Sequence, residues 1–329
     1  MFGRARFVAC CFMLVLGSFA GATRADVAVH ADGRRTEVRE PRADSSGRWW
    51  GEIDGHRTRL DPGEFVAVID DKGRETPIPR PLADGARTAA DDAALASLRD
   101  PRDANYEAAV LAWYAAPKRS VLEALVETTK DKRAAVRKRA LLTLVRLRAT
   151  ESVRAAAEAI LAETDKSVRT ECVSALYSVC EIYRRAGLAE LTQRGIEDKD
   201  AGVRFTFAWL APDDMAAAVD VLKKDGLANS DHHLRESAAM ALARHGDASG
   251  ESTMIGMLTR DRMPGVDDRE LATRLSIAEK VEICGLLGRL GTKTSLAALE
   301  RAAKSPHDAV RAAAERALTK AKSAAPTPP

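Results

Sequence analysis

A Val-Arg pair recurs at nearly regular spacing over the C-terminal two thirds of the chain, and this repeat constrains the possible folds more than any other feature. The first residues of successive copies lie 30, 32, 35, 31, 47 and 29 residues apart. A period of this length is typical of stacked helix pairs, because one pair cannot bury its apolar face alone. The good copies begin at Val136-Arg137, Val168-Arg169, Val203-Arg204, Leu234-Arg235 and Val310-Arg311, and weaker copies begin at Tyr106-Glu107 and Val281-Glu282.

Each good copy continues with helical spacing. A small or apolar residue follows four places after the first anchor residue and a leucine at about eight, as Ala140 and Leu144 follow Val136. Apolar residues at intervals of three and four predict amphipathic helices. An aspartate precedes each good pair, and glycines end two helices further on, at Gly246 and Gly291.

The patterns Asp-x-x-Val-Arg-x-x-Ala-x-x-x-Leu and Leu-Gly-x-Leu-Gly resemble HEAT repeats of the short, phycobilisome-lyase-like type. The resemblance covers roughly residues 104–321. It implies a mostly α-helical fold, an α-solenoid of about seven HEAT-like repeats. Each repeat is then helix A, a turn and a helix B that begins at the Val-Arg pair, with the B helices lining a concave face. It also implies an interaction scaffold whose motif residues are structural.

The recurring acids and arginines have a structural interpretation, which we favour over an acid-base array. An aspartate just before a helix accepts hydrogen bonds from free backbone N–H groups and is stabilised by the helix dipole. Because the arginines occupy one helical position in each copy, stacking predicts a ladder of arginines beside these acids. The predicted ladder consists of Asp131, Arg137, Asp165, Arg169, Asp200, Arg204, Asp231, Arg235, Asp308 and Arg311.

The segment 26–82 has a different pattern and is predicted to be a small all-β module, either an SH3-like barrel or a meander. Short strand-forming runs alternate with Asp-Gly turns, which is typical of hairpins. Prolines at positions 77, 79 and 81 end the module, because proline cannot donate to a strand ladder. Residues 83–103 are predicted to be a linker with one helix, and residues 322–329 a disordered tail.

Residues 1–25 have the organisation of a secretory signal peptide. Two arginines precede an apolar run from Phe7 to Phe19, and residues 23–25 offer a small-x-small cleavage pattern before Asp26. The run is shorter than the roughly 20 residues that span a bilayer, although it could remain as an uncleaved anchor. We expect an exported protein, located in the periplasm, the cell envelope or the medium.

The balance of charge narrows the choice of partner. The chain has 51 Lys and Arg against 48 Asp and Glu, and Arg4, Arg6 and Arg24 lie within the first 25 residues, so 48 of each sign remain beyond them. A neutral chain has no overall field that attracts phosphate backbones or anionic lipid. We therefore expect a protein or peptide partner, with no nucleic acid and no membrane beyond an uncleaved signal anchor.

No catalytic or metal-binding pattern stands out in the sequence. The chain contains no His-Glu-x-x-His, no Cys-x-x-Cys and no glycine-rich phosphate loop. Asp267 and Asp268 alone fall short of the six to eight oxygen ligands that calcium takes. The cysteines beyond the leader, Cys172, Cys180 and Cys284, are expected to be small buried side chains. We expect no cofactor, no metal and no enzymatic activity.

Two features of the solenoid are candidate binding sites. Phe205 and Trp209 are four residues apart and share a helix face away from the core positions, so they form an interface hot spot unless neighbouring repeats bury them. The 47-residue spacing between the copies at Leu234 and Val281 predicts an extended turn from about Arg260 to Ser276. This turn is either part of a binding edge of the solenoid or a tolerated surface insertion. This turn contains the candidate residues Met263, Asp267 and Asp268.

A third candidate lies in the β module, where adjacent Trp49 and Trp50 must face opposite sides of a strand. One is expected in the core, which leaves the other, Trp50 in our assignment, as a candidate binding aromatic. The sequence therefore predicts an exported non-enzymatic scaffold that binds a partner protein or peptide through the solenoid surface. The alternatives are glycan or small-ligand binding by the β module, with the solenoid as a spacer, and lyase-like attachment of a prosthetic group.

Overall fold

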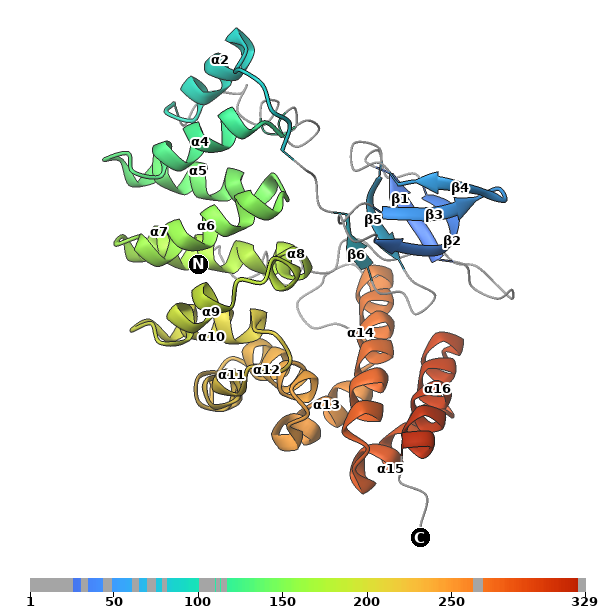
Figure 1. The fold of residues 1–329 in the computed structure, drawn as a ribbon. Helices are drawn as coiled ribbons and strands as arrows, with labels where there is room; N and C mark the ends of the chain where they lie inside the picture. Colours follow the sequence, from blue (N-terminus) through green and yellow to red (C-terminus); the bar gives the residue numbers. More distant parts are fainter. Residues whose placement is uncertain are drawn as a thin grey trace. The chain divides into compact units, whose positions relative to one another are not determined.

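The computed structural model describes residues 26–30, 35–43, 49–60, 65–69, 75–78, 82–100, 110, 113, 117–262 and 269–324 (Figure 1). They form two compact units, one ending at Leu191 and the other beginning at Thr192. The predicted signal peptide lies outside the described residues. The predicted tail begins later than expected, because residues 322–324 belong to the last helix.

The N-terminal segment forms an antiparallel sheet with the strand order β4-β3-β2-β1-β5-β6 (Figure 1). Strands β1 to β4 pair consecutively, as in a meander, and β5 returns to pair with β1. The strands are β1 (Asp26–His30), β2 (Arg35–Ala43), β3 (Trp49–Ile53), β4 (His56–Arg59), β5 (Phe65–Ile69) and β6 (Glu75–Pro77).

A two-residue turn sets the register of the β3–β4 hairpin. Asp54 and Gly55 both have positive φ, 51° and 77°, the conformation that an Asp-Gly turn of this kind requires. Ile53 is thereby placed opposite His56. One face of the sheet carries a small core, which consists of Ala28, Val38, Trp49, Leu60, Phe65, Val68 and Ile78.

The predicted linker contains a capped helix, α2 (Ala89–Ser97). Thr88 and Asp91 form a capping box at its start. The buried Asp91 carboxylate also accepts hydrogen bonds from Trp113 Nε1 at 3.0 Å and from Lys118 Nζ at 2.7 Å. Burial opposes its ionisation, but Lys118 and the Thr88 backbone hold the pKa of Asp91 far below its usual range. This carboxylate therefore ties α2 to the segment that follows it.

The described chain from Arg119 onward is almost entirely helical. In the first unit the helices are α4 (Arg119–Thr128), α5 (Ala134–Arg146), α6 (Thr150–Ala162), α7 (Lys166–Ala175), the 3-10 turn η1 (Leu176–Val179) and α8 (Cys180–Arg185). Helix α9 (Ala189–Ile196) spans the boundary between the units. In the second unit they are α10 (Ala201–Leu210), α11 (Ala216–Val221), the π-helical η2 (Leu222–Leu227), α12 (His232–Arg244), the 3-10 turn η3 (Ala248–Gly250), α13 (Glu251–Leu258), α14 (Arg269–Leu290), α15 (Lys293–Ala302) and α16 (Asp308–Ala324).

Within each unit, helices pack mainly against their neighbours along the chain. Helix α5 packs against α4, α6 and α7 in the first unit, and α12 packs against α10, α13 and α14 in the second. Helix α5 thus also contacts α7, and α10 contacts α12, so within each unit helices that carry successive copies of the pair lie against each other. This is the packing of a helical repeat protein, as the recurring pairs predict. The first weak copy, at Tyr106, lies outside the described residues.

The recurring apolar positions form the core between the helices. Ala140 and Leu144 are fully buried in α5, and the same holds for Ala238 and Leu242 in α12. In the second unit, a cluster of buried alanines, methionines and leucines connects α12, α13, α14, α15 and α16. The spacing of small residues and leucines therefore identifies the buried stripe of each of these helices.

The predicted extended turn from Arg260 to Ser276 is wrong over its second half. Helix α14 begins at Arg269 and continues to Leu290. Ala272 and Ser276 are four residues apart and both are 1% exposed, so this stretch has the spacing of a buried helix face. The long interval between copies is thus partly an N-terminal extension of a helix.

Candidate functional site

The recurring aspartates lie at helix starts. Asp165, Asp200 and Asp231 are the N-cap residues of α7, α10 and α12. The first two each accept hydrogen bonds from two backbone N–H groups of the first turn, and Asp231 accepts one. Asp131 lies three residues before α5 and accepts from the backbone of Arg133 at 2.9 Å. Asp308 is the first residue of α16 and bonds Arg311. The three N-cap carboxylates satisfy backbone donors that have no partner within the helix, whereas Asp308 binds an arginine side chain.

The recurring arginines reach back to the turn before their own helix. Nη1 of Arg137 donates to the carbonyl oxygens of Asp131 and Lys132, at 3.0 and 3.2 Å. Arg204 and Arg235 repeat this contact with the carbonyls six and five residues before them, and Arg311 with the carbonyl six residues before it. Arg169, in α7, is buried. The arginines thus satisfy backbone acceptors in the turns between helices.

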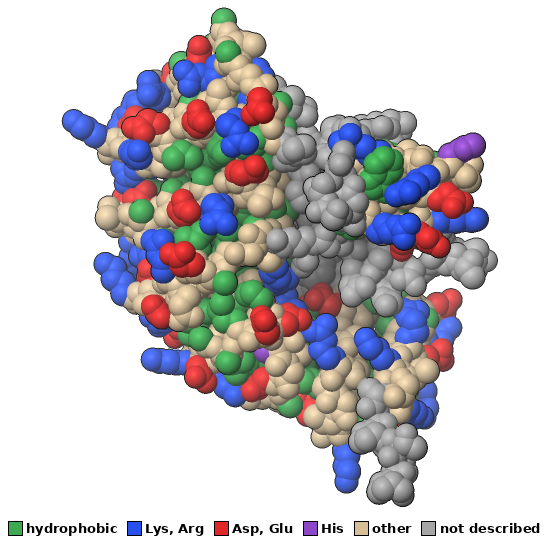
Figure 2. Space-filling model, in the orientation of Figure 1, with side chains coloured by type: hydrophobic (Ala, Val, Ile, Leu, Met, Phe, Trp, Pro, Cys, Tyr) green, Lys and Arg blue, Asp and Glu red, His purple; other side chains and the backbone are tan. Residues whose placement is uncertain are grey.

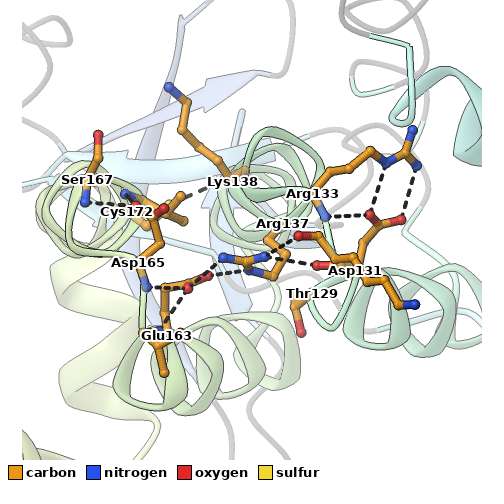
Figure 3. A network of polar contacts seen from close by, with 12 residues as sticks. Thr129, Asp131, Arg133, Arg137, Lys138, Glu163, Asp165, Ser167 and Cys172 are labelled. Atoms are coloured by element: carbon orange, nitrogen blue, oxygen red, sulfur yellow. Dashed lines mark hydrogen bonds and ion pairs between the residues drawn. The ribbon is translucent and has the colours of Figure 1, made fainter.

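Two of these arginines also hold a carboxylate on the following helix, and Figure 3 shows the first of them, Arg137 with Glu163. Nε and Nη2 of Arg137 lie 2.8 and 3.0 Å from the two carboxylate oxygens of Glu163, at the end of α6. Arg204 holds Asp225 in the same way, at 2.7 and 3.1 Å. The acids that pair with these two arginines are therefore Glu163 and Asp225, which the sequence pattern does not single out, and not the recurring aspartates.

The carboxylates of this network are kept ionised. Burial opposes ionisation of Glu163, but Arg137 and the backbone N–H of Asp165 hold the pKa of Glu163 below its usual value. Hydrogen bonds from the Arg133 side chain and backbone lower the pKa of Asp131 to about 2. Figure 3 shows these groups bonded to one another and to the backbone of the turns. This arrangement stabilises the joints between helices and leaves none of these groups placed as a general base.

The prediction that Phe205 and Trp209 form an exposed aromatic pair is wrong for Phe205. Phe205 is 3% exposed, and its ring fills the space beside Gly226, where an added Cβ would lie 2.7 Å from Phe205 Cε2. Trp209 is half-buried, and the Arg244 guanidinium lies 4.8 Å from the centroid of its ring. Only Trp209 of this pair reaches the surface.

Trp209 belongs to a polar cluster at the C-terminal ends of three helices, which we call the Trp209 patch and define as Trp209, Asp213, Arg244 and Arg289. Arg244, the last residue of α12, donates to the Trp209 carbonyl oxygen at 2.9 Å. Arg289, near the end of α14, donates to the Arg244 carbonyl oxygen at 3.0 Å and to Asp213 at 2.8 Å. The sequence pattern does not predict this cluster, although each arginine lies two residues before a glycine with positive φ, Gly246 or Gly291.

The structure separates the two tryptophans of the β module as their adjacency predicts. Trp49 is in the sheet core and Trp50 is on the opposite face. Trp50 lies between Arg42 on β2 and Arg59 on β4, and the Arg57 guanidinium lies 5.2 Å from its ring centroid. This face combines an aromatic ring with several cations.

A second buried ion cluster lies in the second unit. Arg260 donates to Glu236 on α12 and to Glu279 on α14, both at 2.6 Å. Burial raises the pKa of Glu279 to about 7, although Arg260 opposes this. The candidate residues Met263, Asp267 and Asp268 lie outside the described residues, so their prediction is not tested by this geometry.

Of the three cysteines that were predicted to be buried, the structure buries two. Cys172 and Cys284 are buried, and burial raises the pKa of each to about 12. Cys180 is only half-buried, so the prediction is wrong for this residue. No group of three or more His, Cys, Asp or Glu side chains gathers as a metal site among the described residues. None of the described helices has the length and apolar character needed to cross a bilayer.

No model of a known protein family matches the sequence, and comparison with curated proteins finds no match. Among solved structures, the chain resembles an engineered protein with 20% identity and a TM-score of 0.42, covering 61% of this chain and 96% of the other. It also resembles human deoxyhypusine hydroxylase (15% identity, TM-score 0.30, 71% and 96% covered) and a designed armadillo repeat protein (16%, 0.30, 70% and 98%). Because these TM-scores are low, the assignment of a helical repeat fold rests on the packing of the helix pairs in this chain.

Proposed function

We propose that this protein is an exported, non-enzymatic scaffold of about seven HEAT-like repeats that binds a partner protein or peptide through the helical surface. The observation that most supports this proposal is that the recurring arginines bind other parts of the same chain. Arg137, Arg204 and Arg235 donate to backbone carbonyls in the turns of the protein itself. Their charge therefore stabilises the packing of the helices. A stack of this kind presents an extended surface for binding.

The Trp209 patch is the binding site that the geometry favours on this surface. Tryptophan and arginine are the residues most enriched in interface hot spots. The side chains of Arg289 and Asp213 are each 51% exposed, and Trp209 is held in place by Arg244. A patch already fixed in position loses little conformational entropy when a partner binds. Figure 2 shows acidic and basic side chains mixed over the visible helical surface, which suits a partner of mixed charge.

The experiment uses the full chain to capture binding partners from a cell-envelope extract, followed by purification of the captured protein and titration calorimetry. We expect Trp209→Ala and Arg289→Glu, each with unchanged circular dichroism, to weaken binding at least about tenfold, as truncation of a hot spot does. Arg301→Ala, an exposed arginine on α15, is the control and should bind like the wild type. Phe205→Ala is unsuitable, because it would open a cavity in the core.

Two outcomes would contradict this proposal. Equal affinity of the partner for the wild type and both patch variants would remove the Trp209 patch as the site. A partner recovered with an added mass would indicate chemistry and favour the lyase-like alternative. Export is tested separately by N-terminal sequencing of the protein from its native cell, where we expect a chain that begins at Asp26.

Sugar binding by the β module receives less support. A sugar ring stacks on an open aromatic face, and the Arg57 guanidinium already lies over the ring of Trp50. The positive charge of this face favours an acidic ligand over a neutral sugar.

A further inference from the structure

The outer face of strands β2, β3 and β4 carries four arginines around Trp50. Trp50 lies between Arg42 and Arg59 in one cross-strand row, and Glu52 lies between Arg39 and Arg57 in the next row. All four arginines are exposed. No ion pair within 4.0 Å joins any of them to a carboxylate among the residues that the structure describes. With four arginines against the single Glu52 in these two rows, this part of the face has a net positive charge.

Among the strands that the structure describes, β4 is at one end of the sheet, and the backbone groups that do not pair with β3 can be assigned from the hairpin register. In an antiparallel pair, hydrogen-bonded and non-hydrogen-bonded positions alternate. Leu60 N lies 3.0 Å from Trp49 O, so the bonded pairs with β3 include Trp49–Leu60 and Gly51–Thr58. The N–H and C=O groups of Arg57 and Arg59 consequently point away from β3, toward the position of a further strand.

Backbone and side chains of the same two residues thus offer complementary contacts to one kind of ligand. We propose that β4 binds an extended acidic peptide as an added antiparallel strand, with glutamate or aspartate residues at alternate positions opposite Arg57 and Arg59. Main-chain hydrogen bonds would supply affinity in this mode, and side chains on one face would supply specificity. Residues two apart on a strand share a face, so an acid-x-acid spacing matches the two arginines.

The charges of β4 disfavour a second copy of the chain as the occupant. Edge-to-edge pairing of two β4 strands would place arginines opposite arginines, and like charges directly opposite each other destabilise a strand pair. Cations on an edge strand also discourage unspecific pairing. An acidic strand removes this repulsion, and each arginine gains a charge-assisted hydrogen bond.

The test measures binding of a fluorescein-labelled nonapeptide of alternating Glu and Thr to the full chain by fluorescence polarisation. A peptide of the same composition with its glutamates in one block is the first control. We expect the alternating peptide to bind at least about tenfold more tightly than the block peptide. Arg57→Glu and Arg59→Glu should each weaken binding about tenfold or more, whereas Arg154→Glu, on the exposed side of α6, should leave binding unchanged.

Two N-methylated peptides test the pairing itself. In the proposed register the amides of the glutamates face β4, so N-methylation of the two central glutamates should abolish binding, and N-methylation of the threonines should leave it within about threefold. Equal loss from both methylations, or equal binding of the alternating and block peptides, would overturn the proposal in favour of simple charge attraction. Binding of the acidic polysaccharide alginate without binding of any peptide would also overturn it.

Discussion

The guanidinium of Arg137 faces the carboxylate of Glu163 as a planar fork, with Nε 2.8 Å from Oε2 and Nη2 3.0 Å from Oε1. The remaining nitrogen, Nη1, lies 3.0 Å from the carbonyl oxygen of Asp131. One side chain therefore joins the turn before α5 to the end of α6. Lysine could not make these contacts together, because it has one charged nitrogen in place of a fork.

Loss of the Arg137 fork should destabilise the first unit. Arg137→Met keeps the aliphatic stem and removes the charge, which leaves the Glu163 carboxylate, 3% exposed, without its cation. Breaking a buried ion pair in this way costs about 3 kcal/mol. The loss is measured as the free energy of unfolding in urea, followed by circular dichroism.

Arg133→Met is the matched control for Arg137→Met. Arg133 pairs with Asp131 in the same network, but its side chain is 55% exposed, and exposed pairs contribute little. The double variant Arg137→Met, Glu163→Gln should be more stable than Arg137→Met alone, because it removes the uncompensated charge. A loss of stability in Arg133→Met as large as that in Arg137→Met would contradict the assignment.

The N-cap role of the recurring aspartates gives a second prediction. Asp200 Oδ1 accepts from the backbone N–H groups of Gly202 and Val203, at 2.9 and 3.1 Å. Asp200→Ala should lower the free energy of unfolding by about 1 kcal/mol, and Asp200→Asn by only a few tenths, because asparagine caps a helix equally well. Chemical unfolding of the two variants checks this. An asparagine variant as unstable as the alanine variant would mean that Asp200 stabilises the helix through its charge and not through capping.

The helix register could be predicted from the sequence because it depends on local spacing. Ala140 and Leu144 show the buried stripe of α5 by their position alone, and both are fully buried. The β3–β4 hairpin likewise follows from Asp54-Gly55, since few residue pairs adopt the required conformation. Features of this kind depend on residues that are close in sequence.

The arginine contacts and the fate of Phe205 could not be predicted, because they depend on distant or backbone partners. Arg137 and Arg204 bind carbonyl oxygens, which every residue possesses, and their acidic partners hold no recurring position. Phe205 is buried because Gly226, in the next helix pair, lacks a side chain where the ring lies. A helical wheel for α10 alone does not show that contact.

Two glycines in helices should respond to alanine with opposite signs. An added Cβ at Gly195 would lie 2.1 Å from Cγ of the buried Phe207, whereas at Gly285 it would meet nothing within 4 Å. Gly195→Ala should therefore lower the free energy of unfolding by about 1–3 kcal/mol through overpacking. Gly285→Ala should raise it by about 0.5–1 kcal/mol, because alanine loses less backbone entropy. Urea unfolding measures both, and stabilisation by both substitutions would show that the packing around Phe207 is loose.

The buried Glu279 predicts a pH dependence of stability. Burial raises the pKa of Glu279 from its ordinary 4.5 to about 7. Between these values the unfolded chain loses the proton and the folded chain keeps it, so the unfolded state binds fewer protons and stability falls as pH rises. This one group contributes a slope of roughly 1 kcal/mol per pH unit.

Glu279→Gln should remove that contribution, because the amide stays neutral across the range. The measurement is the free energy of unfolding in urea at about pH 5, 6 and 7 for both proteins, and we expect the stability of the wild type relative to the variant to decrease with pH. Glu300→Gln, which removes an exposed carboxylate on α15, controls for the change in net charge. A constant difference between wild type and Glu279→Gln would mean that Arg260, 2.6 Å away, keeps Glu279 ionised throughout, and that burial does not dominate its pKa.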